Sequence, residues 1–213
     1  MMVELHSRGR TIEEVRQCLR QVPMHPRVIS AIRKAHSLPR CELRIISDAN
    51  QFFIETILKQ FGLFDCFTEI VTNHCLLKET GWGYSLTMTL LMVAVYALSI
   101  CARDLPSPQH RVESQSFDGA PLLLDKKGLV IEQIRASISE TWKTRMIYLG
   151  DGSGDFCPSL KLGEGDYVMP RKDFPLWKRI CDNRTIIKAK VYEWSNGEEL
   201  ERILSQLIDT GTV

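Results

Sequence analysis

Two apolar segments far apart in the sequence each end in a cluster of acidic and small polar residues. Residues 41–46 (Cys-Glu-Leu-Arg-Ile-Ile) are followed by Ser-Asp-Ala-Asn at 47–50, and residues 145–149 (Arg-Met-Ile-Tyr-Leu) by Gly-Asp-Gly-Ser-Gly-Asp at 150–155. Both segments have the length and apolar character of buried strands. Because ligands of open parallel sheets bind beyond the carboxyl ends of the strands, the two clusters are candidates for one binding site.

Helical patterns separate the predicted strands. Apolar spacing predicts helices over 11–20, 27–37, 51–61, 130–138 and 197–207, and further strands over 67–72 and 167–169. Thr11 with Glu14 forms a capping-box pattern at the start of the first helix. Strands that alternate with helices indicate an α/β fold with a parallel sheet.

The composition is that of an ordinary globular protein. The 213 residues suffice for one domain with a sizeable core, and a net charge of +1 argues against nucleic acid as a partner. The seven cysteines show no Cys-x-x-Cys spacing, and we see no signal-peptide pattern ahead of them. They therefore indicate reduced thiols and a cytoplasmic location.

The two polar clusters suit phosphate and metal chemistry. Glycines on both sides of Asp151 permit a tight turn, so that Asp151 and Asp155 can converge on one Mg²⁺ ion. Ser47 and Asn50, with the backbone amides of their turn, suit a phosphoryl group. Taken singly, the first cluster also fits a helix N-cap and the second an ordinary turn.

Residues 46–55 and 148–158 resemble the second and fourth motifs of the phosphoethanolamine/phosphocholine phosphatase family, which is of the haloacid-dehalogenase type. The resemblance is closest to the plant branch, described as pyrophosphatase-like or related to pyridoxal-phosphate phosphatase. It covers roughly residues 1–80 and 127–210. It implies a Rossmann-like parallel sheet with a small helical cap, and Mg²⁺-dependent hydrolysis of small phosphomonoesters or pyrophosphate through an aspartyl-phosphate.

The resemblance also assigns roles to individual residues. Asp151 would bind Mg²⁺ with the support of Asp155. Ser47, Asp48 and Asn50 would bind the substrate, with Ser47 on the phosphate. Lys127 lies where the family keeps a charge-neutralising lysine, although a solvated lysine at a helix start is an equal alternative. Phosphoethanolamine, phosphocholine, pyridoxal phosphate and pyrophosphate all remain open as substrates.

One family motif is absent from the sequence. The family carries its nucleophile and its acid/base in an Asp-x-Asp at the end of the first strand, and this sequence contains no Asp-x-Asp. Residues 1–40 resemble the inside of the cap. We therefore expect a partial helical cap over 1–40, a core over 41–80 and 127–213, a missing first strand, and an inactive chain. A remnant that binds phosphorylated ligands or a partner without catalysis is the alternative.

Residues 81–126 depart from the family. No charged residue occurs between 81 and 102, and residues 84–101 are apolar over the length of a membrane span. The family has a polar, Cys-Pro-rich segment here, and permitted codons read in a shifted frame can recover it. We therefore interpret residues 81–126 as an anomalous insert from frame-shifted or unspliced sequence. A single-pass membrane helix over 84–101 is the alternative.

Overall fold

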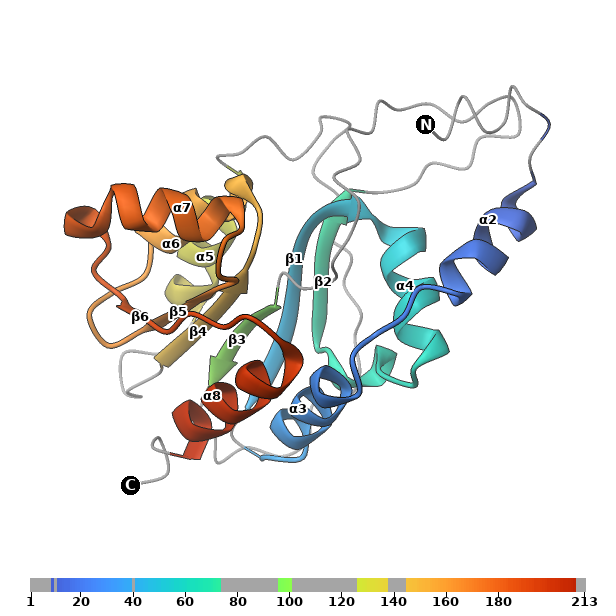
Figure 1. Ribbon diagram of the computed structural model, residues 1–213, viewed down its shortest axis with the longest axis horizontal. Helices are drawn as coiled ribbons and strands as arrows, with labels where there is room; N and C mark the ends of the chain where they lie inside the picture. The colour runs from blue at the N-terminus through green and yellow to red at the C-terminus, as the bar shows by residue number, and fades with distance from the viewer. Residues whose placement is uncertain are drawn as a thin grey trace.

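The computed structural model describes residue 9 and residues 11–39, 41–73, 96–100, 126–137 and 145–209, with the backbone alone at 96–100. Its centre is a six-stranded sheet in the order β2-β1-β3-β4-β5-β6 (Figure 1). The strands are β1 (Glu42–Asn50), β2 (Glu69–Asn73), β3 (Tyr96–Ile100), β4 (Arg145–Gly150), β5 (Tyr167–Pro170) and β6 (Lys190–Val191). The β1–β2, β4–β5 and β5–β6 pairs are parallel, so the predicted α/β class is confirmed.

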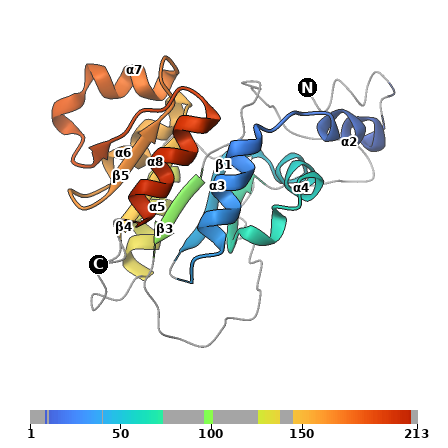
Figure 2. The same ribbon diagram turned by 60° about the horizontal axis from the view of Figure 1, so that its bottom comes forward.

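Helices cover both faces of this sheet. The described α-helices are α2 (Ile12–Arg20), α3 (Pro26–His36), α4 (Gln51–Gln60), α5 (Lys126–Ser137), α6 (Phe156–Leu160), α7 (Pro175–Asp182) and α8 (Gly197–Asp209). α3 and α8 lie side by side on one face (Figure 2). α5, α6 and α7 pack on the other face, which gives the three layers of a Rossmann-like protein.

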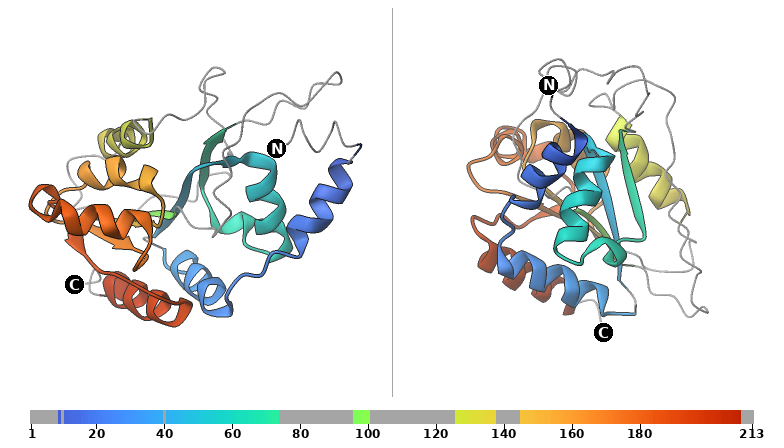
Figure 3. Two further views of the ribbon diagram at one scale, coloured as in Figure 1. Left: turned by 45° about the horizontal axis from the view of Figure 1, so that its top comes forward. Right: turned by 90° about the vertical axis from the view of Figure 1, so that its right-hand side faces the viewer.

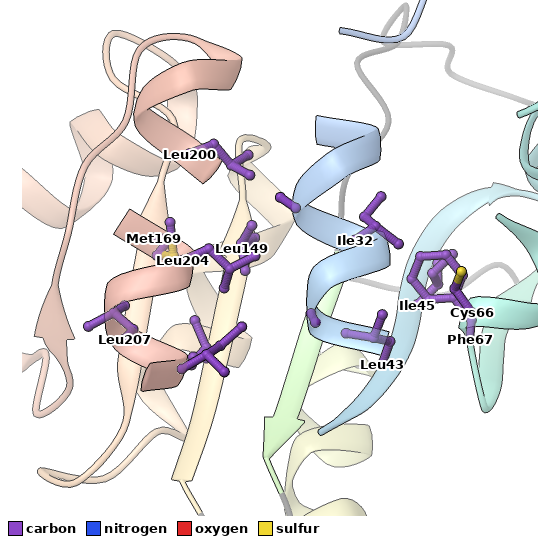
Figure 4. Close-up of a cluster of buried hydrophobic side chains, with 14 of the residues drawn as sticks. Ile32, Leu43, Ile45, Cys66, Phe67, Leu149, Met169, Leu200, Leu204 and Leu207 are labelled. Atoms are coloured by element: carbon purple, nitrogen blue, oxygen red, sulfur yellow. The ribbon is translucent and has the colours of Figure 1, made fainter. Parts of the chain in front are cut away.

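The alternation of side chains along β4 divides the core in two. Ile147 and Leu149 face α3 and α8, where Ile32 and Leu204 are among their neighbours in one buried cluster (Figure 4). Met146 and Tyr148 face the opposite way, into the cluster that α5, α6 and α7 cover. Burial on both faces explains why this strand reads as a continuous apolar run.

The amino-terminal helices pack in two places. Thr11 and Glu14 form the predicted capping box, and α2 lies against α4 (Figure 3), where Leu19, Phe53 and Ile57 are buried together. α3 instead packs on the sheet and on α8 as part of the main core. The predicted division at residue 40 would assign both helices to the cap, and that division stays a prediction.

Strand β3 separates β1 from β4 and runs antiparallel to both. Its residues, 96–100, belong both to the predicted insert (81–126) and to the predicted membrane span (84–101). Apart from Lys126, which is the first residue of α5, the other residues of the insert lie outside the described ranges. Among the described residues, no helix has the length and hydropathy needed to span a bilayer.

Two predicted boundaries differ from the structure near the polar clusters. β1 continues to Asn50, because Asn50 still pairs with Asn73 after an irregularity that follows Ile46. α5 begins at Lys126 instead of residue 130, so Lys127 is a helical residue. α6 and α7 were not predicted: α6 has only five residues, and α7 begins at Pro175, directly after an irregular segment.

Candidate functional site

The two predicted polar clusters lie at the carboxyl ends of β1 and β4, and Arg171, the residue after β5, lies at the same edge of the sheet. The backbone N–H of Arg171 donates to the carbonyl of Gly150 over 3.0 Å, and that of Leu176 donates to the carbonyl of Asp151 over 3.1 Å. The end of β5 and the start of α7 therefore hold the Gly150–Asp155 loop in place. This edge of the sheet is the expected position of a ligand site in an open α/β sheet.

The Asp155 carboxylate accepts four hydrogen bonds. It is 1% exposed, and its Oδ1 accepts from the Tyr148 hydroxyl at 2.9 Å and from Lys127 Nζ at 3.2 Å. Its Oδ2 accepts from the backbone N–H groups of Asp151 (3.1 Å) and Gly152 (2.9 Å). Burial, together with the Asp155 charge, holds the pKa of Tyr148 well above its usual value, so the hydroxyl remains a donor. Asp155 therefore shapes the loop that carries Asp151.

Lys127 connects the two polar clusters. Its side chain comes from the first turn of α5, is 4% exposed, and places Nζ 2.7 Å from Asp48 Oδ2 and 3.2 Å from Asp155 Oδ1. Burial alone would lower the pKa of Lys127, but the charges of Asp155 and Asp48 outweigh it and raise the pKa. The lysine is therefore cationic at neutral pH, and the alternative of a solvated lysine does not describe this side chain.

Asp151 is a half-buried carboxylate beside this ion-paired group. Burial and the neighbouring Asp155 raise its pKa from 3.8 to about 6, against the opposing charges of Arg171 and Lys127. A bound cation would favour the ionised form, so the carboxylate suits a hard divalent ion. Among the described residues, no three His, Cys, Asp or Glu side chains gather closely enough to hold a metal by themselves. A Mg²⁺ ion here would need water and ligand oxygens as well.

The other predicted substrate residues are only partly oriented toward this site. Ser47 Oγ accepts from the Ala49 N–H at 3.1 Å, and Asp48 reaches Lys127 while its side chain stays 48% exposed. Asn50 is buried, and its Oδ1 accepts from the Phe52 N–H at 2.9 Å as the N-cap of α4. Asn50 therefore acts as a helix N-cap, which is the alternative that the sequence left open for the first cluster.

Arg171 is the residue of this edge that was not predicted as a site residue. Its guanidinium lies 4.1 Å from the centre of the Phe174 ring and 5.4 Å from that of Trp194, and its charge opposes the rise in the Asp151 pKa. In the sequence, Arg171 lies two residues after the strand predicted over 167–169, close to the position that the other two clusters occupy after their strands.

The fold and the site together define a Rossmann-like α/β protein with a lysine and several carboxylates at the carboxyl edge of its sheet. Residues 1–208 match the family model described as "Putative Phosphatase". The chain therefore belongs to this phosphatase family, and the predicted resemblance is confirmed.

Curated relatives agree with this assignment. The chain is 46% identical over 211 residues to "Inorganic pyrophosphatase 2" of Arabidopsis thaliana, which covers 98% of the chain and 68% of the relative. It is 46% identical over 213 residues to the "Thiamine phosphate phosphatase-like protein" of the same plant, covering 100% and 78%. It is 29% identical over 202 residues to "Pyridoxal phosphate phosphatase PHOSPHO2" of Bos taurus, covering 92% and 73%. No solved structure matches the chain significantly.

Proposed function

We propose that the polar site at the carboxyl ends of β1 and β4 binds the phosphoryl group of a small phosphorylated compound together with Mg²⁺. The observation that carries the proposal is the buried Lys127, whose Nζ lies between Asp48 and Asp155 next to the half-buried Asp151. A fixed cation beside a carboxylate that favours a metal is the electrostatic arrangement that phosphoryl groups require.

Each residue has a distinct part in this proposal. Asp151 would hold the Mg²⁺, which when bound supplies positive charge to the phosphoryl oxygens. Asp155 positions the loop through the amides of Asp151 and Gly152. Lys127 offsets negative charge, and Ser47 with the exposed part of Asp48 would contact the substrate. The names of the relatives suggest small phosphate esters and pyrophosphate as the class of substrate.

Hydrolysis by the family route needs an aspartate nucleophile, and we propose that this chain binds without turnover. The sequence has no Asp-x-Asp to supply the nucleophile and the acid/base, and covalent phosphoryl transfer has no route without them. The family activity is that of a phosphatase, whereas this chain would be a non-hydrolysing binder of phosphorylated ligands. A cytoplasmic location remains part of this prediction.

The test is a turnover assay with 4-nitrophenyl phosphate and with pyrophosphate in Mg²⁺, on the wild-type chain and on Asp151→Asn. We expect both proteins to release product at the same background rate. A Mg²⁺-dependent release by the wild type that Asp151→Asn abolishes would instead establish a phosphatase that uses a different nucleophile, and would contradict the absence of turnover.

A further inference from the structure

Helix α7 holds the loop that carries Asp151 at two points. The backbone N–H of Leu176 donates to the Asp151 carbonyl over 3.1 Å. One turn further along the helix, Arg179 Nη1 donates to the carbonyl oxygen and to Oγ of Ser153, each over 3.1 Å. Residues three apart lie on the same face of a helix, so one face of α7 spans the loop from Asp151 to Ser153.

The Arg179 side chain is itself held in position. Its guanidinium lies 4.3 Å from the centre of the Phe156 ring, which is buried and directly follows Asp155. Among the described residues, both hydrogen bonds that this guanidinium donates go to Ser153. Ser153 is exposed and lies between two glycines, so this part of the loop has no apolar side chain that could fix it on the core. Arg179 therefore ties the solvent side of the loop to the helical layer.

Mg²⁺ binding depends on the precise placement of its ligands. The ion demands near-octahedral geometry at about 2.0–2.1 Å and releases its waters reluctantly, whereas Ca²⁺ accepts oxygens at about 2.3–2.6 Å in flexible arrangements. A carboxylate on a loop that can shift would therefore lose more affinity for Mg²⁺ than for Ca²⁺. Groups that orient metal ligands typically contribute about 10–100-fold to metal affinity.

We propose that Arg179 is a positioning residue of the Mg²⁺ site, which acts through Ser153 to fix the loop so that the Asp151 carboxylate meets the ion in one geometry. The inference rests on the proposed function, which places the metal on Asp151. Arg179 is cationic, so its charge by itself opposes the binding of a second cation nearby. Positioning and charge therefore predict opposite effects of removing the side chain, and the sign of the change distinguishes them.

The test is calorimetric titration of Mg²⁺ and, separately, of Ca²⁺ into the full chain. We expect Arg179→Met to weaken Mg²⁺ binding about tenfold and Ca²⁺ binding by less than about threefold, because Mg²⁺ requires the stricter geometry. Lys178→Met is the matched control, since it removes an exposed cation from the neighbouring position of α7. It should leave both affinities unchanged or slightly raised, because exposed charges are screened by solvent and salt.

Two milder variants test the contact with less disturbance of α7. Arg179→Lys keeps the charge and a donor but loses the planar group that binds two acceptors and stacks on Phe156, so its Mg²⁺ affinity should lie between those of the wild type and Arg179→Met. Ser153→Ala removes only the Oγ acceptor and should weaken Mg²⁺ binding by a smaller factor than Arg179→Met. Combined with Arg179→Met it should cause no further loss, because the hydroxyl acts through Arg179. A further loss as large as in the single variant would contradict the proposed contact.

The outcomes separate this inference from the proposed function. If the wild type binds no Mg²⁺, the proposed function is wrong and the inference falls with it. If the wild type binds Mg²⁺ and Arg179→Met binds it equally or more tightly, Arg179 does not position the loop, and the proposed site stands. Equal weakening of both metals would indicate a general loss of structure and would overturn the assignment. A selective loss of Mg²⁺ affinity that Arg179→Lys partly restores is the expected result.

Discussion

Asp155 is engaged by four donors, two from side chains and two from the backbone, and it is almost completely buried. Its charge is needed to compensate Lys127, which is also buried. We expect Asp155→Asn to lower the free energy of unfolding by about 3 kcal/mol, because it leaves Lys127 with a weaker partner in a buried position. Urea unfolding checks this, with the exposed Asp182→Asn as control. A loss below about 1 kcal/mol would mean that the loop does not depend on the carboxylate.

Asp151 should make the folded state less stable as the pH rises, which is the opposite of the effect of an ion-paired aspartate. Its pKa is raised from 3.8 to about 6, so between these values the folded state keeps a proton that the unfolded state has lost. Its contribution to stability is therefore present below pH 3.8 and is lost as the pH rises through 6.

The measurement is the stability of the wild type and of Asp151→Asn across this range. As the pH rises from 4 to 7 without Mg²⁺, the variant should become more stable relative to the wild type, because asparagine does not ionise. A constant difference over this range would show that the Asp151 pKa is not raised.

At the scale of single elements, the sequence predicted which segments are strands and helices better than where they end. Apolar runs located β1, β4 and β5 because burial on the sheet fixes their composition. The extension of β1 to Asn50 depends on pairing with Asn73, which no local pattern records. The early start of α5 placed Lys127 on a helix facing the sheet, and this was equally invisible from sequence spacing. Arg171 was missed for the same reason, since its neighbours Phe174 and Trp194 are set by tertiary packing.

The turn after β4 offers a test with a matched pair of glycines. A Cβ atom on Gly150 would lie 2.7 Å from Asp155 Oδ2 and 2.8 Å from Asp155 Cβ, whereas a Cβ on Gly165 would meet nothing within 4 Å. We expect Gly150→Ala to cost about 1–3 kcal/mol of stability by forcing Asp155 out of place. Gly165→Ala should stay within about 0.5 kcal/mol of wild type. Thermal unfolding distinguishes them, and equal stabilities would refute the tight packing of Asp155 on this turn.

At the scale of the whole molecule, the proposed phosphate site lies on a mixed sheet, in which one antiparallel strand separates two parallel groups. The residues proposed to bind Mg²⁺ and the phosphoryl group come from β1, the loop after β4, and α5. The strand between β1 and β4 is β3, which runs antiparallel to both neighbours. The sequence predicted the family and the acidic clusters from local motifs. It did not predict an antiparallel strand at this position, because residues 96–100 carry only an apolar run that fits a strand, a buried helix or a membrane span equally.

The most direct test of the proposed phosphoryl site is calorimetric titration of inorganic phosphate into the protein with and without Mg²⁺, repeated on Asp151→Asn. We expect saturable binding that requires Mg²⁺ and is lost in the variant, because Asp151 is the carboxylate proposed to hold the metal beside Lys127. Lys34→Met, which affects only an exposed pair with Asp209 at the far end of α3, should bind as the wild type does. Phosphate binding that is absent, or that is unaffected by both Mg²⁺ and Asp151→Asn, would contradict the proposed site.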